Sequence, residues 1–481
     1  MKREGSNPPS DKAGKKGVTP GHVLALRAHH LPNLKEYVKD GIRMHFNGRL
    51  GYSDAFGRAH DEVLERIASD PNRKILLVET TDSICMTGVC PKFNPECAKE
   101  EGDRAHAAMF GLAVNTEYTA GELMAAVSKP VLTLREVALK SGERMTIKLV
   151  TPPAEEYLEK LLRFLEHKPD AIRRNIKQRL QGHYAKYCVD KFFVGEIEGK
   201  IVGQVWYGYS NSGTGIANFG EVYTEPEYRR RGISRELMKV FINDFWNSPA
   251  VAALCTAGDM AAGMYMQFGF QTVVPGTSYG PMILIRKGLA ENFAEFEKEY
   301  YKPGSAVSVV PGTMKHRHDI DTLLRYSTIL RRRRENWASI SGSGARLAGR
   351  VGPAYGVPNY MEACFMAEDG KGQVFVAVTD QGNVVGWAFL LNPASQWEQK
   401  SMVFDYEIAP TYTGSAGLLV RESMRLAGEG GAQRAWAWYR ASDSGKIDPL
   451  LAAGFAEAGR LPDYFVEGEA ASDMVVLRFG K

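Results

Sequence analysis

The segment 222–238 constrains this chain more than any other. A strand-like run ends at Thr224, a turn with three consecutive arginines and a glycine follows, and a helix with apolar residues at helical spacing then begins. The first N–H groups of a helix have no internal acceptor, and the helix dipole places partial positive charge there. Arginine guanidinium groups form charge-assisted hydrogen bonds with phosphate oxygens. The segment therefore predicts a binding site for a molecule that carries phosphates.

The turn 229–234 also resembles a known motif. Its sequence, Arg-Arg-Arg-Gly-Ile-Ser, resembles motif A of the GNAT superfamily of N-acetyltransferases, R/Q-x-x-G-x-G/A, with Ser234 in place of the last Gly or Ala. A second segment, 261–270, resembles motif B of the same superfamily, A-x-x-L-Y-x-x-x-G-F, and Gly258 stands where an Asn is often found. The two motifs occur in the family's order and at a plausible separation, which makes the resemblance specific.

The resemblance implies an acyl-coenzyme A dependent N-acyltransferase, by default an N-acetyltransferase that uses acetyl-CoA. The acyl group would pass directly to an amine of a small molecule or peptide. An amine must lose a proton to attack a thioester, and the departing thiolate must gain one. The resemblance assigns the acid to Tyr265, and Glu221 lies on the strand where the base is often found. The residues implied in coenzyme A binding are Val222, Thr224, Arg229, Arg230, Arg231, Gly232, Ile233 and Ser234.

Each of these assignments has an alternative. Consecutive arginines are often only a solvated face, Tyr265 also fits a core tyrosine, and Glu221 also fits an exposed strand residue. At the level of the whole protein, the alternative is a metal- or redox-sensing regulator whose GNAT-like lobe binds coenzyme A without turnover. A radical enzyme is disfavoured because the chain has no C-x3-C-x2-C spacing.

The segment 145–290 alternates strand and helix patterns, which predicts an α/β fold. A Glu198-Gly199 turn between two apolar runs predicts a β-hairpin. The predicted strands are 145–150, 192–197, 200–209, 217–224, 251–256 and 282–285.

The segment 305–481 repeats this plan, which argues for internal duplication. The repeat lacks the chemical groups of the first copy, because 413–418 carries no arginine and Leu450 stands at the position of Tyr265. We therefore predict a second, degenerate GNAT-like domain that is structural or shapes the acceptor site. The matching segments, at offsets of 183, 184 and 185 residues, are 199–206 with 382–389, 226–228 with 410–412, and 269–270 with 454–455.

The segment 20–130 has a different character. It contains a predicted strand, 74–79, followed by a loop in which Cys85, Cys90 and Cys97 form a C-x4-C-x6-C cluster. With His30 as a fourth ligand, these thiolates could hold zinc or an iron–sulfur cluster. The alternative is three buried or unliganded thiols. The fold class predicted for the whole chain is α/β, with two GNAT-like mixed-sheet lobes in tandem preceded by a small α+β domain of metal-binding type.

The cysteine-cluster segment resembles a small bacterial domain family of unknown activity that is described as a predicted iron–sulfur binder. The resemblance rests on an R-x-H-H-L run at 27–31, a G-Y-S-x-x-F run at 51–56 and a D-x-I-C run at 82–85. The family has a further cysteine that aligns with Asn33, so this chain lacks one ligand of that pattern.

Composition limits the remaining possibilities. A formal charge of +4 over 481 residues is too small to indicate nucleic-acid binding. No apolar run is long enough to span a membrane, and residues 1–19 resemble a disordered tail more than a signal peptide. The six cysteines are too few for a disulfide scaffold, which favours a reducing cytoplasm. Cys188, Cys255 and Cys364 lie in apolar runs, where buried packing is expected.

Overall fold

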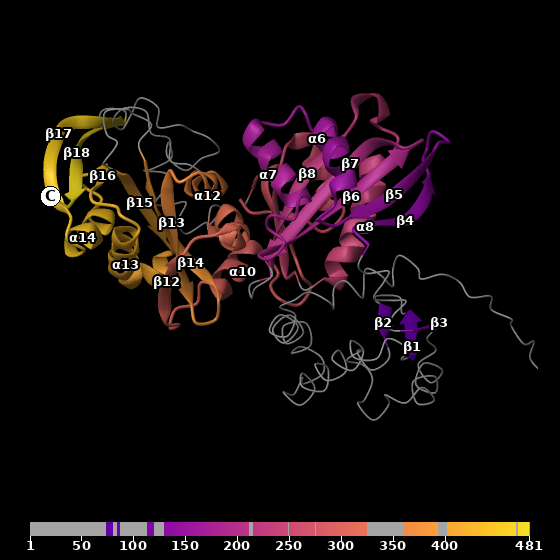
Figure 1. Ribbon diagram of the computed structural model, residues 1–481, viewed down its shortest axis with the longest axis horizontal. Coiled ribbons are helices and arrows are strands. Elements are labelled where there is room, and N and C mark those ends of the chain that lie inside the picture. Colours follow the sequence, from indigo (N-terminus) through magenta and orange to yellow (C-terminus); the bar gives the residue numbers. More distant parts are fainter. Residues whose placement is uncertain are drawn as a thin grey trace, which may run out of the picture.

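The computed structural model consists of two large β-sheets, each covered by helices, and a small third sheet (Figure 1). None of the described helices has the length and apolar character that a membrane span requires. The described residues are 74–79, 84–86, 113–119, 129–210, 215–248, 250–274, 276–324, 360–392, 402–467 and 470–480.

The small sheet is antiparallel, with the strand order β2-β1-β3. Strand β1 has the bounds predicted from the sequence. Cys85 lies on β2, opposite Val78, and not in a loop as the sequence suggested. The other predicted metal ligands, His30, Cys90 and Cys97, and the predicted tail 1–19 lie outside the described residues. The strands are β1 (Lys74–Glu79), β2 (Ile84–Met86) and β3 (Ala113–Thr119).

The sheet of the first lobe has eight strands in the order β10-β11-β9-β8-β7-β6-β5-β4. Edge strand β4 precedes the predicted start of this lobe at 145. The predicted hairpin joins β6 to β7, and its turn residues Glu198 and Gly199 have φ angles of 50° and 79°. Positive φ at both turn residues matches the twist of the flanking strands. The strands are β4 (Val131–Ala138), β5 (Arg144–Val150), β6 (Cys188–Ile197), β7 (Lys200–Ser210), β8 (Ile216–Thr224), β9 (Ala252–Ala257), β10 (Gln271–Thr272) and β11 (Gly280–Ile285).

Helices cover both faces of this sheet, and each face has its own apolar cluster. On one face, Phe219, Phe241 and Phe270 pack between the sheet and helices α8 and α9. On the other face, Trp206 and Phe192 pack under helices α6 and α7. The helices of this lobe are α6 (Glu155–Phe164), α7 (Asp170–Leu180), α8 (Ile233–Asn247), α9 (Asp259–Met266) and α10 (Phe293–Tyr300).

The parallel neighbours in this sheet, β8 and β9, separate part-way along their length. They pair at 216–218 with 252–254, and no further register joins these two described strands. The carboxyl-terminal half of β8 therefore lies apart from β9. A gap between two parallel strands exposes backbone groups inside an otherwise continuous sheet, and such a gap is a place where a ligand can bind.

The second lobe repeats the topology of the first. Its seven-stranded sheet has the order β12-β13-β14-β15-β16-β18-β17, and β15 and β16 are again parallel neighbours. Apart from edge strand β4, which has no counterpart in the second sheet, the two mixed sheets have the same strand order, and this confirms the predicted α/β fold with tandem lobes. The elements are β12 (Val307–Pro311), α12 (Tyr360–Glu368), β13 (Gly372–Thr379), β14 (Val384–Leu391), β15 (Met402–Ile408), α13 (Ala416–Glu429), β16 (Ala435–Arg440), α14 (Ser444–Ala452), β17 (Ala456–Glu467) and β18 (Ala470–Phe479).

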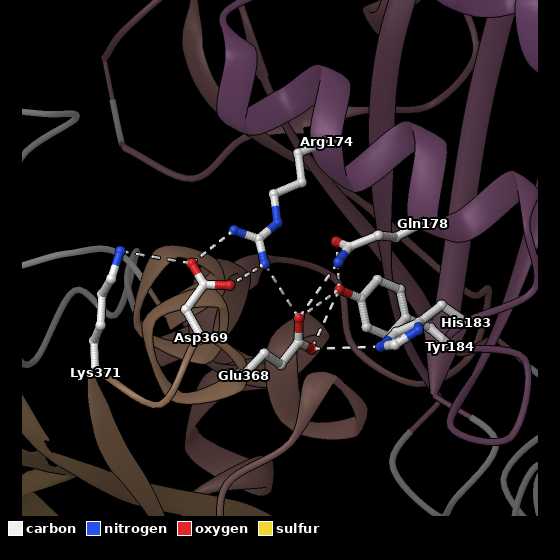
Figure 2. Close-up of polar contacts among 7 residues, drawn as sticks. All are labelled: Arg174, Gln178, His183, Tyr184, Glu368, Asp369 and Lys371. Carbon is white, nitrogen blue, oxygen red and sulfur yellow. Dashed lines mark hydrogen bonds and ion pairs between the residues drawn. The ribbon is translucent and has the colours of Figure 1, made fainter.

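The two lobes are joined by a shared apolar core and by a polar network. The core contains Ile216 and Leu254 of the first lobe together with Phe365 of the second. In the network, Arg174 on α7 forms a bidentate pair with Asp369, at 2.9 and 3.1 Å (Figure 2). The same figure shows Glu368 between Arg174 and the cluster of Gln178, His183 and Tyr184. Contacts of both kinds fix the second lobe against the α6–α7 side of the first.

Candidate functional site

The turn that precedes α8 has the backbone shape of an anion site. Arg230 has a φ of 66° and Gly232 a φ of 93°, so two residues turn through left-handed conformations before the helix begins. Gly232 is the N-cap of α8, and no side chain caps the helix there. The first N–H groups of α8 therefore have neither an internal acceptor nor a capping side chain. This arrangement places several N–H donors and positive dipole charge at one point.

The three arginines of the turn have different surroundings. Arg231 donates to both carboxylate oxygens of Glu143 at 2.6 Å, and to the carbonyl oxygen of Glu227 at 2.8 Å. Hydrogen bonds from Ser141 and Arg231 lower the pKa of Glu143. Arg229 donates from Nε to the carbonyl oxygen of Thr224 at 3.2 Å, which leaves its other nitrogens available.

Arg230 differs from both neighbours, since no carboxylate among the described residues pairs with its exposed side chain. The sequence pattern treated the three arginines alike. The structure instead shows that Arg231 binds the turn to the β4–β5 hairpin, whereas Arg229 and Arg230 pair with no carboxylate among the described residues.

The start of α8 is anchored tightly to the sheet. A Cβ atom added to Gly203 on β7 would lie 2.4 Å from Ile233, so only glycine allows the helix to approach this closely. Ile233 is buried, and the hydroxyl groups of Ser234 and Thr224 lie 2.7 Å apart. Val222 packs partly buried against the α8 cluster. These four predicted residues are thus brought together at the end of β8, where they hold the turn in place.

A β-bulge interrupts the pairing of β7 with β8 just before this turn. Gln204 pairs with Tyr223 and Trp206 pairs with Gly220, so the register shifts between them. Glu221 lies in the bulge with a φ of 53°. Its carbonyl oxygen accepts a hydrogen bond from the side-chain nitrogen Nε2 of Gln204 at 3.2 Å. The bulge therefore turns backbone groups of β8 out of the ladder at the point where the strand leaves β9.

The carboxylate of Glu221 faces the turn between α6 and α7. Its Oε2 atom lies 3.3 Å from Nζ of Lys168, and its side chain is 15% exposed. Next to Lys168, the ring of His167 lies 4.0 Å from the ring of Tyr223. Desolvation and the neighbouring Lys168 charge lower the pKa of His167, although its side chain is exposed. The predicted base thus lies half-buried beside the ammonium group of Lys168, a contact that the sequence did not reveal.

Tyr265 lies in the aromatic cluster on the α8 side of the sheet. Its ring contacts those of Phe219 and Phe270, with centroid separations of 5.3 and 5.6 Å. The side chain is buried, and burial followed by the influence of Cys255 raises its pKa above the ordinary value of a phenol. The core interpretation of the ring is therefore correct, and the role of its hydroxyl as an acid stays a prediction. Glu221 and Tyr265 belong to opposite sides of the sheet.

In the corresponding part of the second lobe, side-chain contacts link strand β15 to helix α14. The 184-residue offset places Asp405 on β15 at the position of Glu221, and the 185-residue offset places Lys446 on α14 at the position of Ala261. Lys446 Nζ donates to the carbonyl oxygen of Tyr406 and lies 3.6 Å from Asp405. The hydroxyl of Tyr406 in turn donates toward the carbonyl oxygen of Lys446 at 3.1 Å.

No such link crosses the gap in the first lobe. Among its described residues, no hydrogen bond or ion pair joins the carboxyl-terminal half of β8 to α9, where Ala261 takes the place of the lysine. The two lobes therefore share a topology but differ in the polar contacts that link the first parallel strand to the helix after the second: Lys446 and Tyr406 make such contacts in the second lobe, and none is found among the described residues of the first.

No group of three or more His, Cys, Asp or Glu side chains suited to a metal ion occurs within the described part of the chain. The predicted burial of Cys188, Cys255 and Cys364 is confirmed. Burial raises the pKa of each of these thiols, so they are packing residues that stay protonated.

Comparison with protein-family models gives two matches. Residues 189–272 match the acetyltransferase (GNAT) domain. This segment is a GNAT acetyltransferase domain. The match covers β6 to β10, including the bulge, the arginine turn and Tyr265, and confirms the prediction that the chain is an acetyltransferase. It does not favour the regulator alternative. Residues 51–140 match a family described as protein of unknown function DUF1284, which leaves the predicted iron–sulfur site untested.

Solved structures similar to the chain include several acetyltransferases. Spermidine N-acetyltransferase from Vibrio cholerae, in complex with CoA and spermine, is 15% identical with a TM-score of 0.28, over 36% of this chain and 94% of that one. Ribosomal-protein-S5-alanine acetyltransferase from Vibrio fischeri is 15% identical with a TM-score of 0.27, over 36% and 91%. A GNAT-family acetyltransferase from Streptococcus pneumoniae is 13% identical with a TM-score of 0.28, over 36% and 98%. None of the curated proteins compared with the chain matches it.

Proposed function

We propose that the first lobe, 145–290, is the catalytic domain of an acetyl-CoA dependent N-acetyltransferase that acylates an amine directly. One observation supports this most. The arginine turn and the uncapped start of α8 lie at the end of β8, where that strand has left β9, and all of these features fall within the matched segment 189–272. A phosphate site beside an open strand gap suits a ligand with a pyrophosphate at one end and a thioester at the other.

In this proposal the pyrophosphate of coenzyme A binds the N–H groups of the turn 229–234, with Arg229 and Arg230 as charged donors. The pantetheine chain then extends into the gap between β8 and β9, where backbone groups of β8 are not used by a neighbouring strand. N–H groups that point into such a gap can polarise the thioester carbonyl and stabilise the oxyanion of the tetrahedral intermediate.

The chemistry requires one base and one acid. We propose that Glu221 accepts a proton from the acceptor amine, whose nitrogen then attacks the thioester carbon. The tetrahedral intermediate breaks its C–S bond as the hydroxyl of Tyr265 donates a proton to the departing thiolate. The nitrogen then releases its remaining extra proton to solvent, and solvent returns a proton to the tyrosinate, so the products are an amide and coenzyme A. Burial keeps the phenol of Tyr265 protonated at neutral pH, as an acid requires.

We propose that the second lobe, 305–481, binds no acyl donor. Lys446 and Tyr406 bridge its strand gap, and its turn at 413–418 has no arginine. This lobe instead packs against α7 through Arg174 and Asp369, on the side of the sheet where Glu221 lies. It therefore supports the wall of the acceptor site. Calorimetric titration with coenzyme A should give one site per chain, and a second site would contradict this assignment.

The deciding experiment is a screen of amines for thiol release from acetyl-CoA, with a thiol reagent as the detector and mass spectrometry of the acylated product. Small aliphatic amines, aminoglycosides and peptides with free N-termini represent the acceptor classes. We expect acceptor-dependent release by the wild-type chain. Coenzyme A binding without release across the whole panel would contradict the proposed activity.

A further inference from the structure

A buried glutamine on the α6–α7 side of the sheet has an oxygen atom without a hydrogen-bond partner. Gln204 is fully buried on β7. Its Nε2 atom donates to the carbonyl oxygen of Glu221. A carbonyl oxygen only accepts, so the amide must turn its NH2 group toward it. The Oε1 atom of Gln204 then points elsewhere and receives no donor from any of the described residues.

The carboxylate of Glu221 also has a buried oxygen that receives no hydrogen bond. Within the described part of the chain, Oε2 of Glu221 is buried and has no hydrogen-bond donor, although Nζ of Lys168 lies 3.3 Å away. The ammonium group balances the charge of the carboxylate, but its direction of approach is not that of a hydrogen bond. A carboxylate in this setting can still accept a hydrogen bond from another group.

The two residues are neighbours in the fold. The amide of Gln204 is bonded to the backbone of Glu221 itself, and both residues flank the bulge where β8 leaves β9. An unpaired polar atom in a buried position carries a free-energy cost that a suitable ligand removes. The complementary ligand has several N–H donors and a positive charge, which describes a primary ammonium group.

We propose that Gln204 and Glu221 form a recognition site for the primary ammonium group of the acceptor. In this proposal the ammonium group of Lys168 lies at the edge of the site and competes with the acceptor for the carboxylate of Glu221. The identification of the bound amine as the acceptor rests on the proposed function. The ammonium of the acceptor donates to Oε1 of Gln204 and to Oε2 of Glu221, and it displaces the ammonium of Lys168 from the carboxylate. Glu221 then accepts one of its protons, which leaves the neutral amine held by Gln204.

The proposed site should bind a cation that has N–H donors more tightly than a cation of the same charge and size that has none. The n-butylammonium and tetramethylammonium ions have the same charge and the same number of heavy atoms, but the second has no N–H donor. We expect n-butylammonium to bind the full-length protein at least about tenfold more tightly, since one bond to a charged acceptor and one to a neutral acceptor are gained. Ligand-detected NMR titrations at constant ionic strength measure both affinities. Equal affinities would overturn the proposal.

Two variants test the residues separately. Gln204→Met keeps an unbranched side chain without polar atoms, and should reduce the preference for n-butylammonium to less than about threefold. Lys168→Met removes the resident ammonium from a surface turn, and should tighten n-butylammonium binding about three- to tenfold because Glu221 loses its competitor. Lys177→Met, on an exposed position of α7, is the matched control and should change neither affinity.

Two results would contradict the proposed roles. An unchanged preference in Gln204→Met would exclude Gln204 from the site. Weaker n-butylammonium binding in Lys168→Met would show that Lys168 positions Glu221 instead of competing at it, and this variant decides the matter even where Gln204→Met does not fold. No acyl donor is present in these titrations. Failure of acyl transfer with intact cation selectivity would therefore count against the enzymatic proposal alone.

Discussion

The buried guanidinium group of Arg286 holds the carboxyl-terminal end of α8, the helix whose other end forms the anion turn. Arg286 follows β11 and is 6% exposed. Its nitrogens donate to the carbonyl oxygens of Phe245 and Trp246 at 3.0 Å, of Ala250 at 2.8 and 2.9 Å, and of Ser248. The last carbonyl groups of a helix lack internal partners, and a cation there complements the helix dipole.

The substitution Arg286→Met keeps the length of the aliphatic stem and removes every donor. Four carbonyl groups lose their charged partner. With about 1 kcal/mol for each, the value of an ordinary hydrogen bond and below that of a bond to a charged group, we expect the end of α8 to lose about 4 kcal/mol. At about 1.4 kcal/mol per factor of ten, this corresponds to roughly a thousandfold loss of protection from hydrogen exchange.

Hydrogen exchange detected by mass spectrometry on peptides that cover 240–250 measures this loss directly. Arg286→Lys keeps the charge but not the fork of donors, so we expect an intermediate loss of about thirtyfold. Arg235→Met removes an exposed arginine from the same helix, bonded to Gln267 at 2.5 Å, and should change protection less than about threefold. Protection in Arg286→Met within tenfold of the wild type would refute the role given to the guanidinium group.

Four further predictions concern the site and its surroundings. Gly232→Glu should weaken coenzyme A binding at least about hundredfold in calorimetry, because a positive φ and a negative charge both oppose the phosphate site; unchanged affinity would remove the turn from the donor site. Tyr265→Phe should leave donor affinity intact and lower kcat by ~10–1000-fold, and wild-type turnover would limit Tyr265 to packing. Burial raises the pKa of Asp405 and Lys446 opposes this rise. Lys446→Met should therefore lower the melting temperature more at alkaline than at acidic pH, because a protonated Asp405 no longer needs a cationic partner; a loss that does not change with pH would argue against the pairing. Elemental analysis after anaerobic purification should find stoichiometric iron or zinc that Cys90→Ser loses, and its absence from the wild type would leave the cysteines as plain thiols.

The local signals in the sequence predicted most of the first lobe. The Glu198-Gly199 hairpin was predictable because its turn type needs residues that tolerate positive φ, and a glycine supplies one of them. The buried strands β6 and β7 were predictable as apolar runs. Strand β4 was missed because it is a mostly exposed edge strand, and its pattern of residues does not differ clearly from that of a linker.

The arginine turn could be predicted because its determinants are adjacent in the chain. Its partners could not. Arg231 is bound by Glu143, a residue 88 positions earlier in an exposed hairpin, and nothing local marks that carboxylate. Lys168 reaches Glu221 only because α6 and α7 cover the same face of the sheet as the bulge, and Gln204 reaches it because β7 pairs with β8 there. A bulge with one extra residue also changes which side chains share a face, and strand periodicity cannot anticipate this.

Comparison of the two lobes separates what the fold requires from what the site requires. Glycines recur where the backbone needs them: Gly199 and Gly382 have φ angles of 79° and 84°, and Gly269 and Gly454 have 92° and 98°. These positions maintain the shared strand order. The two lobes diverge at the arginine turn and at the strand gap, where Ala261 in one lobe corresponds to Lys446 in the other. Loss of the arginine turn in one lobe, with the strand order from β5 to β11 retained in both, is expected if one copy of a duplicated domain keeps the chemistry and the other keeps only its shape.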